Sequence, residues 1–498
     1  MLWTLEESLS GILHIPSRMR FALTVNPPGA VMRRFFCHLL AGAMISLPVL
    51  RGEEAKEAGK AALSVREMDP ARQWSQFRGY RARGILPGSG LPVSWSVEKG
   101  ENVLWQTGIR GLGHASPIVW GDCIYLATAV TEEVQELDVK VRGDVGSARD
   151  TGLQQWRLLA LDKATGEVLF NKLALEGNPR VKRHTKATHC NSTPATDGKN
   201  LVAIFGSEGL FCFDMKGEMR WRKDLGPMDA GWFRAKTAQW GFGSSPVIHD
   251  GKVVVLCDVQ EGSFLAVYRI EDGKELWKTP REDVPTWGTP TIVEHDGKTQ
   301  ILVNGWHHTG AYDFESGAEI WKLKGGGDIP VPTPVTAHGN VFLSNAHGRH
   351  SPMRAVRLSA RGDITLKKIE ETSEHIPWVH RRKGAYMATP IVVGKNLYSC
   401  DGGGVLTCFD TVSGEIRYRE RIGQGGGGFT ASPVSDGSHI FFAGETGKVF
   451  VVKAGDEFAV AAENELGETC LSSPALTDGM LFFRTRFKLI AIGAKGRK

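Results

Sequence analysis

The chain has 498 residues, with 60 Lys and Arg against 55 Asp and Glu, so its formal net charge is only +5. The basic residues are dispersed along the sequence, which argues against a dedicated nucleic-acid surface. Hydrophobic residues make up 41% of the sequence, enough for a chain of this length to bury a large core.

The N-terminal region has the layout of an export signal. Residues 1–31 show no period and no repeat, whereas Met32 begins a segment with two Arg, a mostly apolar run to Leu50 and then acidic residues. Such a layout is typical of a secretory signal, and the run is short for a membrane-spanning helix. We expect residues 1–31 to be a gene-model extension and 32–52 a signal peptide that directs the protein to the periplasm or cell envelope. The alternative is an uncleaved signal-anchor, which would be the chain's only membrane contact.

Residues 53–73 are rich in Ala, Glu and Lys and are expected to be a linker. After them, one phrase recurs eight times: a Ser-Pro or Thr-Pro pair, an apolar strand, a tight turn and a second apolar strand. Self-similarity at a period of roughly 40–50 residues indicates a solenoid or a propeller. The prolines of the eight pairs are Pro117, Pro194, Pro246, Pro290, Pro334, Pro390, Pro433 and Pro474.

Each repeat has a second half, seen most clearly in Ala311–Trp321 and again in Ala160–Phe170 and Cys408–Tyr418. Turn glycines such as Gly317 supply the positive φ values that tight hairpins need. Each unit therefore predicts four antiparallel strands, A to D. Four-stranded units repeated radially are the blades of a β-propeller.

The chain ends predict how the ring closes. The eighth unit stops after Ile492 without its own strand D, and the missing strand stands before the first unit, around Gly100–Trp105. We therefore predict an all-β, eight-bladed propeller in which the N-terminal strand Val103–Thr107 completes the last blade. Closure of this kind removes free sheet edges.

Three further segments, Trp74–Gly79, Leu91–Trp95 and Asn102–Thr107, accompany the repeats. Together they resemble the PQQ-like, BamB-like β-propeller repeat proteins over about residues 74–498. The eleven-residue phrase is similar to the tryptophan-docking motif of quinoprotein dehydrogenases, in which the Trp of one blade packs onto the Ala and Gly region of its neighbour. The resemblance implies structural docking roles for Ala160, Gly166, Ala311, Gly317 and Trp321.

Antiparallel connectivity places the D–A and B–C loops on one face of the ring, here called the loop face. The long segments are expected there, and such loops usually carry function. They are 106–113, 127–157, 171–189, 222–242, 304–309, 344–353 and 367–384.

These segments are rich in His and Trp, which makes the loop face the candidate binding surface. The alternative is that the same side chains satisfy loop backbone and line a water-filled channel. No HExxH or similar metal spacing is present, so no catalytic or metal-binding residue is predicted. The candidate binding residues are His184, His189, Trp240, Trp287, Trp306, His347, His350, His375 and Trp378.

A quinoprotein dehydrogenase usually has two adjacent cysteines against its quinone. The eight cysteines here include no such pair and no CxxCH haem site, while a Cys400–Cys408 disulfide stays open. We expect no cofactor and a non-enzymatic, monomeric scaffold whose loop face binds an envelope protein or a small ligand. The alternatives are a PQQ- and Ca²⁺-dependent alcohol or sugar oxidoreductase and a carbohydrate-binding propeller.

Overall fold

The computed structural model describes residues 68–494, except 134, 136, 140–144, 236, 370 and 425–427. The predicted gene-model extension, the signal peptide and most of the linker lie outside the described residues. In the described part of the chain, no helix is long and apolar enough to cross a membrane.

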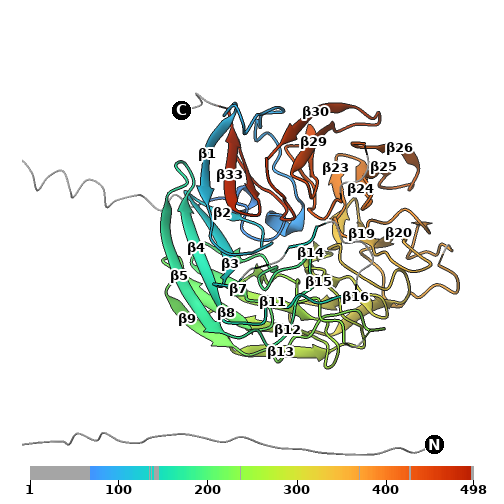
Figure 1. Cartoon of the computed structure of the whole chain (residues 1–498). Coiled ribbons are helices and arrows are strands. Elements are labelled where there is room, and N and C mark those ends of the chain that lie inside the picture. Colours follow the sequence, from blue (N-terminus) through green and yellow to red (C-terminus); the bar gives the residue numbers. More distant parts are fainter. Residues whose placement is uncertain are drawn as a thin grey trace, which may run out of the picture. The chain divides into compact units, whose positions relative to one another are not determined.

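Eight antiparallel sheets surround a central axis, as Figure 1 shows, and the predicted eight-bladed propeller is confirmed. The first two blades follow the chain order from the innermost strand outward. The strands of blade one are β2 (Ile118–Trp120), β3 (Cys123–Val130), β4 (Gln154–Asp162) and β5 (Val168–Gly177), and those of blade two are β6 (Ala195–Thr196), β7 (Asn200–Ile204), β8 (Leu210–Asp214) and β9 (Met219–Lys223).

Blades three and four repeat this pattern. Blade four gains a fifth, parallel strand from the connection between the third and fourth strands of blade five. Blade three holds β10 (Val247–His249), β11 (Lys252–Cys257), β12 (Phe264–Arg269) and β13 (Glu275–Pro280), and blade four holds β14 (Thr291–His295), β15 (Lys298–Val303), β16 (Thr309–Asp313), β17 (Glu319–Leu323) and the added β21 (Gly362–Asp363).

Blades five to seven complete the series before the closing blade. Their strands are β18 (Val335–Ala337), β19 (Asn340–Ser344), β20 (Met353–Arg357) and β22 (Trp378–His380) in blade five, β23 (Ile391–Val393), β24 (Asn396–Cys400), β25 (Val405–Asp410) and β26 (Ile416–Arg421) in blade six, and β27 (Val434–Ser435), β28 (His439–Ala443), β29 (Lys448–Lys453) and β30 (Val460–Glu465) in blade seven.

Blade eight joins the two ends of the propeller. It consists of β31 (Ala475–Thr477), β32 (Met480–Arg484) and β33 (Lys488–Gly493), with β1 (Val103–Gly108) as its outer strand. The prediction that the N-terminal strand closes the ring is confirmed.

One cross-strand pair recurs in the blades. The aromatic residue of strand D lies opposite a small residue of strand C, as Trp321 lies opposite Ala311 and Phe170 opposite Ala160. A small partner leaves room for the large ring, which then reaches the next blade. Trp321 is 1% exposed and belongs to the same hydrophobic cluster as Val341 of blade five.

A turn glycine of the next blade receives the ring in most cases. A Cβ atom at Gly166 would come within 2.4 Å of the Trp105 ring, and one at Gly317 within 2.5 Å of the Trp277 ring. The indole N–H of Trp277 also donates to the Phe314 carbonyl at 3.0 Å. Glycine is needed there for space as well as for its positive φ.

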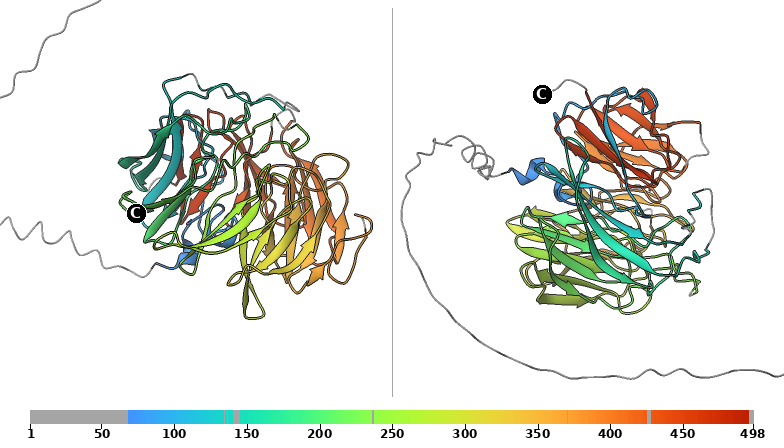
Figure 2. Two further views of the ribbon diagram at one scale, coloured as in Figure 1. Left: turned by 90° about the horizontal axis from the view of Figure 1, so that it is seen from below. Right: turned by 60° about the vertical axis from the view of Figure 1, so that its left-hand side comes forward.

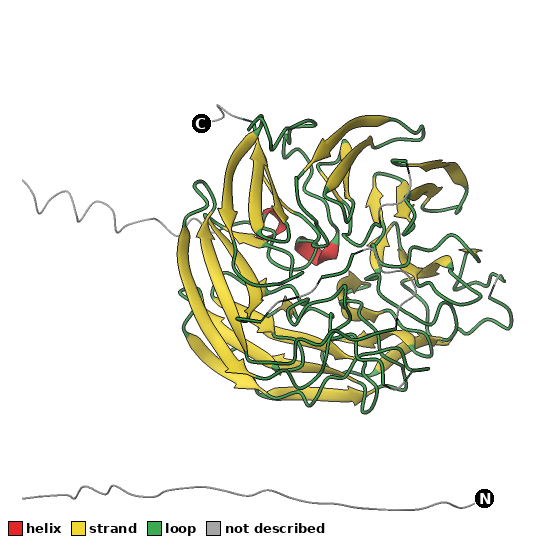
Figure 3. Cartoon of the chain, in the orientation of Figure 1, coloured by secondary structure: helices red, strands yellow, loops and turns green. Residues whose placement is uncertain are grey.

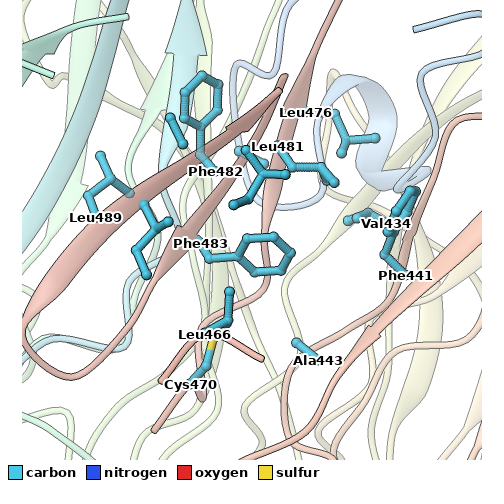
Figure 4. Packing of buried hydrophobic residues seen from close by; sticks show 14 of the residues in the cluster. Val434, Phe441, Ala443, Leu466, Cys470, Leu476, Leu481, Phe482, Phe483 and Leu489 are labelled. Atoms are coloured by element: carbon cyan, nitrogen blue, oxygen red, sulfur yellow. The ribbon is translucent and has the colours of Figure 1, made fainter. Parts of the chain in front are cut away.

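Blade seven lacks an aromatic residue in strand D, where Ala462 lies opposite Val451. Trp95, from the segment before β1, fills the gap instead. Its ring centroid lies 6.4 Å from that of Phe441 and 5.7 Å from that of Phe483. Figure 4 shows Phe441 and Phe483 in the cluster that joins blades seven and eight.

One expectation about the loop face is wrong. Residues 358–377 connect β20 to β22, which are strands C and D of blade five, so most of segment 367–384 lies on the tight-turn side. Trp378 lies opposite Ala355 and packs over Gly414, as a docking residue does. An insertion in the C–D turn separates Trp378 from the rest of its repeat phrase, so its docking role could not be recognised from the sequence.

The seven described cysteines are all free thiols. Cys408 lies opposite Tyr398, and Cys400 lies opposite Leu406. The disulfide that the sequence left open between Cys400 and Cys408 is therefore absent.

Candidate functional site

A cavity of about 640 Å³ occupies the centre of the ring. Its base is lined by the Ser or Thr of all eight Ser/Thr-Pro pairs, one from each blade. We call these eight residues the hydroxyl belt: Ser116, Thr193, Ser245, Thr289, Thr333, Thr389, Ser432 and Ser473.

The hydroxyl belt is a chain of hydrogen bonds that runs from blade to blade. The backbone N–H of Ser116 donates to the hydroxyl of Thr193, the N–H of Thr193 donates to Ser245, and so on to Ser473, with distances of 2.8–3.2 Å. The belt thus explains why a hydroxyl residue precedes seven of the eight prolines: its side chain accepts the hydrogen bond of the preceding blade, whereas no such bond reaches the hydroxyl of Ser116.

The segment that precedes β1 forms the floor of the cavity. Phe77 lines the cavity, and the buried guanidinium of Arg78 donates to carbonyls at the start of blades six and seven, including those of Pro390 (3.0 Å) and Pro433 (3.2 Å). The backbone of Trp74 pairs with Val119 of blade one. The short helical turn η2 (Tyr80–Ala82) of this segment lies near the centre of the ring in Figure 3. The cavity is therefore a funnel with a floor, open toward the loop face.

Aromatic side chains from separate blade connections form the wall of the funnel. Trp240 and Trp287 stack with centroids 5.7 Å apart, and His184 meets Trp240 edge-on at 5.6 Å. The indole N–H of Trp287 donates to the Gly241 carbonyl at 2.9 Å, which fixes the ring. Rings held in this way present a preformed apolar surface.

An ion pair joins loops of blades one and seven, which lie on either side of the closing blade. Lys186, from the loop between blades one and two, places its Nζ 2.9 Å from both carboxylate oxygens of Glu445, from a loop of blade seven. The hydroxyl of Thr430 also donates to Glu445. His114 contacts the Lys186 carbonyl through Nε2 at 2.9 Å, and burial lowers its pKa to about 4, so its ring is neutral at pH 7.

A second bridge crosses the loop face from the connection between blades two and three. Arg234 Nε lies 3.1 Å from Asp328, which also accepts from His347 at 2.6 Å. The ring of His347 meets Trp232 edge-on, with centroids 5.6 Å apart. These contacts fix Trp232 and His347 at the cavity wall. Figure 2 shows the propeller from two further sides.

A buried charge cluster supports the neighbouring loop. Asp283 accepts the backbone N–H groups of Trp306, His307 and His308. Arg281 donates to Asp258 at 2.7 and 3.0 Å and lies farther from Asp283, at 3.5 Å. Burial, and then the charge of Asp258, raise the pKa of Asp283 to about 6, although Arg281 opposes the shift. The cluster orders the 304–309 loop.

Four of the nine predicted binding residues line the funnel: His184, Trp240, Trp287 and His347. His189 is buried, with Nε2 3.1 Å from the Asp150 carbonyl, and His350 accepts from Arg381. Trp306 stacks on His307. His375 belongs to the C–D connection of blade five, and Trp378 docks on blade six.

The sequence analysis missed the hydroxyl belt, Phe77, Lys186 and Glu445. The belt had a visible signal, because the hydroxyl residue recurs before every one of the eight prolines. Lys186 and Glu445 had none, because their pairing depends on closure of the ring.

The residues present do not fit a bound Ca²⁺ ion, which takes six to eight oxygen ligands. Glu445 is the only carboxylate among the described residues that line the funnel, and Lys186 already neutralises it. The described ranges also hold no cluster of three or more His, Cys, Asp or Glu suited to a metal.

A family model described as outer membrane protein assembly factor BamB matches residues 143–418. The chain belongs to this BamB family. Its propeller is similar to the crystal structure of BamB from Moraxella catarrhalis, with 12% identity and a TM-score of 0.52 over 78% of this chain and 99% of that chain.

Two other solved structures resemble this BamB-family chain. Quinohemoprotein alcohol dehydrogenase ADHIIG from Pseudomonas putida HK5 is 11% identical, with a TM-score of 0.54 over 86% of this chain and 81% of that chain. The computationally designed Ika8 protein is 10% identical, with a TM-score of 0.50 over 78% and 97%. Such low identities show a shared fold alone. No curated protein matches the chain.

Proposed function

We propose that this chain is an exported, non-catalytic scaffold that binds an envelope partner at its loop face, with the funnel as the anchor pocket. The observation that carries the proposal is the funnel itself. It measures about 640 Å³ and is lined by fixed aromatic rings from separate blade connections. Binding sites of this kind are concave, mostly apolar and preformed.

Membership of the BamB family supports the scaffold role and the envelope location. The dehydrogenase alternative is less well supported, because the one carboxylate among the described lining residues is held by Lys186 and leaves no oxygen set for Ca²⁺. The carbohydrate-binding alternative rests on Trp240 and Trp287, whose stacking on each other occupies one face of each ring.

Site-specific photo-crosslinking in the source envelope tests the proposal. A photoreactive phenylalanine analogue replaces Trp240 at the funnel wall in one variant and Leu169 on the outer strand of blade one in the control, since Leu169 is 52% exposed. We expect a discrete cross-linked partner from position 240 and none from position 169. The same partner from both positions, or from neither, would rule out the loop face as the binding surface.

A further inference from the structure

The hydroxyl groups of the belt can donate hydrogen bonds, and their structural role does not use this capacity. A Ser or Thr hydroxyl offers one donor and two acceptor sites. Seven belt hydroxyls, from that of Thr193 to that of Ser473, each accept one backbone N–H. Within the described part of the chain none of the seven donates to a protein acceptor. The eighth, Ser116, makes no side-chain hydrogen bond there.

All eight belt residues line the cavity, so their hydroxyl hydrogens are available at its base. The base is therefore a circle of hydrogen-bond donors supplied by every blade. The blades hold the hydroxyl oxygens at the base, and each hydroxyl hydrogen can rotate toward negative charge on a ligand.

The one carboxylate of the described funnel lining and the ring of His114 do not compete for these donors. Glu445 is held by Lys186 and Thr430. His114 is neutral at pH 7 and has its Nε2 engaged with the Lys186 carbonyl. The described lining thus contains no uncompensated negative charge, and an acceptor-rich ligand meets no repulsion at the base.

We infer that the hydroxyl belt binds the carboxylate head of a small organic anion whose apolar body lies against Trp232, Trp240 and Trp287. The inference rests on the proposed function, in which the funnel is the binding pocket. A volume of about 640 Å³ suits a ligand of this kind. Hydrogen bonds to a charged acceptor are roughly twice as strong as neutral ones, so the belt should favour a carboxylate over an alcohol.

The test compares three probes that share one ring system: 2-naphthoate, 2-naphthalenemethanol and 2-naphthylmethylamine. Affinities are measured by calorimetry and by quenching of tryptophan fluorescence in the full-length protein. We expect naphthoate to bind at least about tenfold more tightly than the alcohol or the amine, as one charge-assisted hydrogen bond would give.

Two matched variants locate the effect. Ser116→Ala removes a belt hydroxyl that accepts no described hydrogen bond, so the fold should be unchanged. Ser192→Ala is the control, because Ser192 is also buried (0% exposed, against 2% for Ser116) and its hydroxyl also has no partner among the described residues, but it lies outside the cavity lining. We expect Ser116→Ala to weaken naphthoate binding about tenfold and Ser192→Ala to leave it unchanged.

Equal affinity for the three probes would overturn the carboxylate inference while leaving the funnel as a binding pocket. Equal losses in the two variants would overturn it as well. If no probe binds, the inference falls, and the cross-linking experiment still decides the proposed function separately.

Discussion

Lys186 and Glu445, 259 positions apart in the chain, meet with Nζ 2.9 Å from both carboxylate oxygens. The pair links the loop after blade one to a loop of blade seven, on either side of the closing blade. It therefore ties the start and the end of the propeller together at the mouth of the funnel.

Breaking this pair should destabilise the ring. Lys186→Met leaves the buried Glu445 carboxylate with Thr430 alone, and we expect a loss of about 1–3 kcal/mol in the free energy of unfolding. Removing both charges, in Lys186→Met with Glu445→Gln, should recover part of the loss. A double-mutant cycle by chemical denaturation measures the coupling. Strictly additive losses would show that the pair contributes nothing.

The docking glycines allow a matched comparison of space and strain. Gly317 and Gly297 share a φ of +70°, but a Cβ atom at Gly317 meets the Trp277 ring and one at Gly297 meets nothing within 4 Å. Gly297→Ala should cost about 1–2 kcal/mol from backbone strain. Gly317→Ala should cost about 1–3 kcal/mol more because of overpacking. Equal thermal shifts for the two variants would contradict a tight Trp277–Gly317 contact.

Trp321 should be a large contributor to the contact between blades four and five. Its side chain is 1% exposed, so Trp321→Ala is expected to cost about 3–5 kcal/mol, the usual range for a large aromatic residue in a core. Thermal unfolding measures the loss. An unchanged melting temperature would exclude the docking role.

Asp283 should make stability depend on pH in an uncommon direction for a carboxyl group. Burial raises its pKa to about 6, above the value of about 3.9 in an unfolded chain. Between these values the folded state binds more protons than the unfolded state, so this group lowers stability as pH rises from about 4 to 6. Relative to Asp283→Asn, the wild type should gain stability as pH falls from 7 to 5. A constant difference over this interval, measured by urea denaturation at each pH, would contradict the raised pKa.

Purified protein should not bind PQQ tightly through Ca²⁺, so PQQ, itself an aromatic carboxylate, should bind no better with Ca²⁺ than without it. The funnel offers aromatic walls, but Glu445, the only carboxylate among its described lining residues, is already paired with Lys186. Calorimetric titration with PQQ and Ca²⁺ checks this expectation. Stoichiometric binding below about 1 μM, which corresponds to roughly −8 kcal/mol, together with alcohol-dependent dye reduction would favour the dehydrogenase alternative.

Local repetition explains what could be predicted from the sequence. The Ser/Thr-Pro pairs and the Ala311–Trp321 phrase fix strand order within each blade, and the displaced strand Val103–Thr107 predicts closure. The prediction that Trp378 lies on the loop face was wrong, because an insertion in the C–D turn separates this residue from the rest of its repeat phrase. Contacts such as Lys186 with Glu445 could not be predicted, since they depend on how separate blades face one another.

The closing strand also determines when the ring can be completed during synthesis. β1 is synthesised before blade one, yet its partner β33 belongs to the last blade. Until the C-terminal residues emerge, β1 has no partner and the cavity lacks Ser473, so the funnel is incomplete on a growing chain. Such distant pairing is slow to form and leaves edges exposed meanwhile. A chain truncated before β31 would therefore form an open, aggregation-prone series of blades with two unpaired edges. Only a chain synthesised to its C-terminal strands can close the ring.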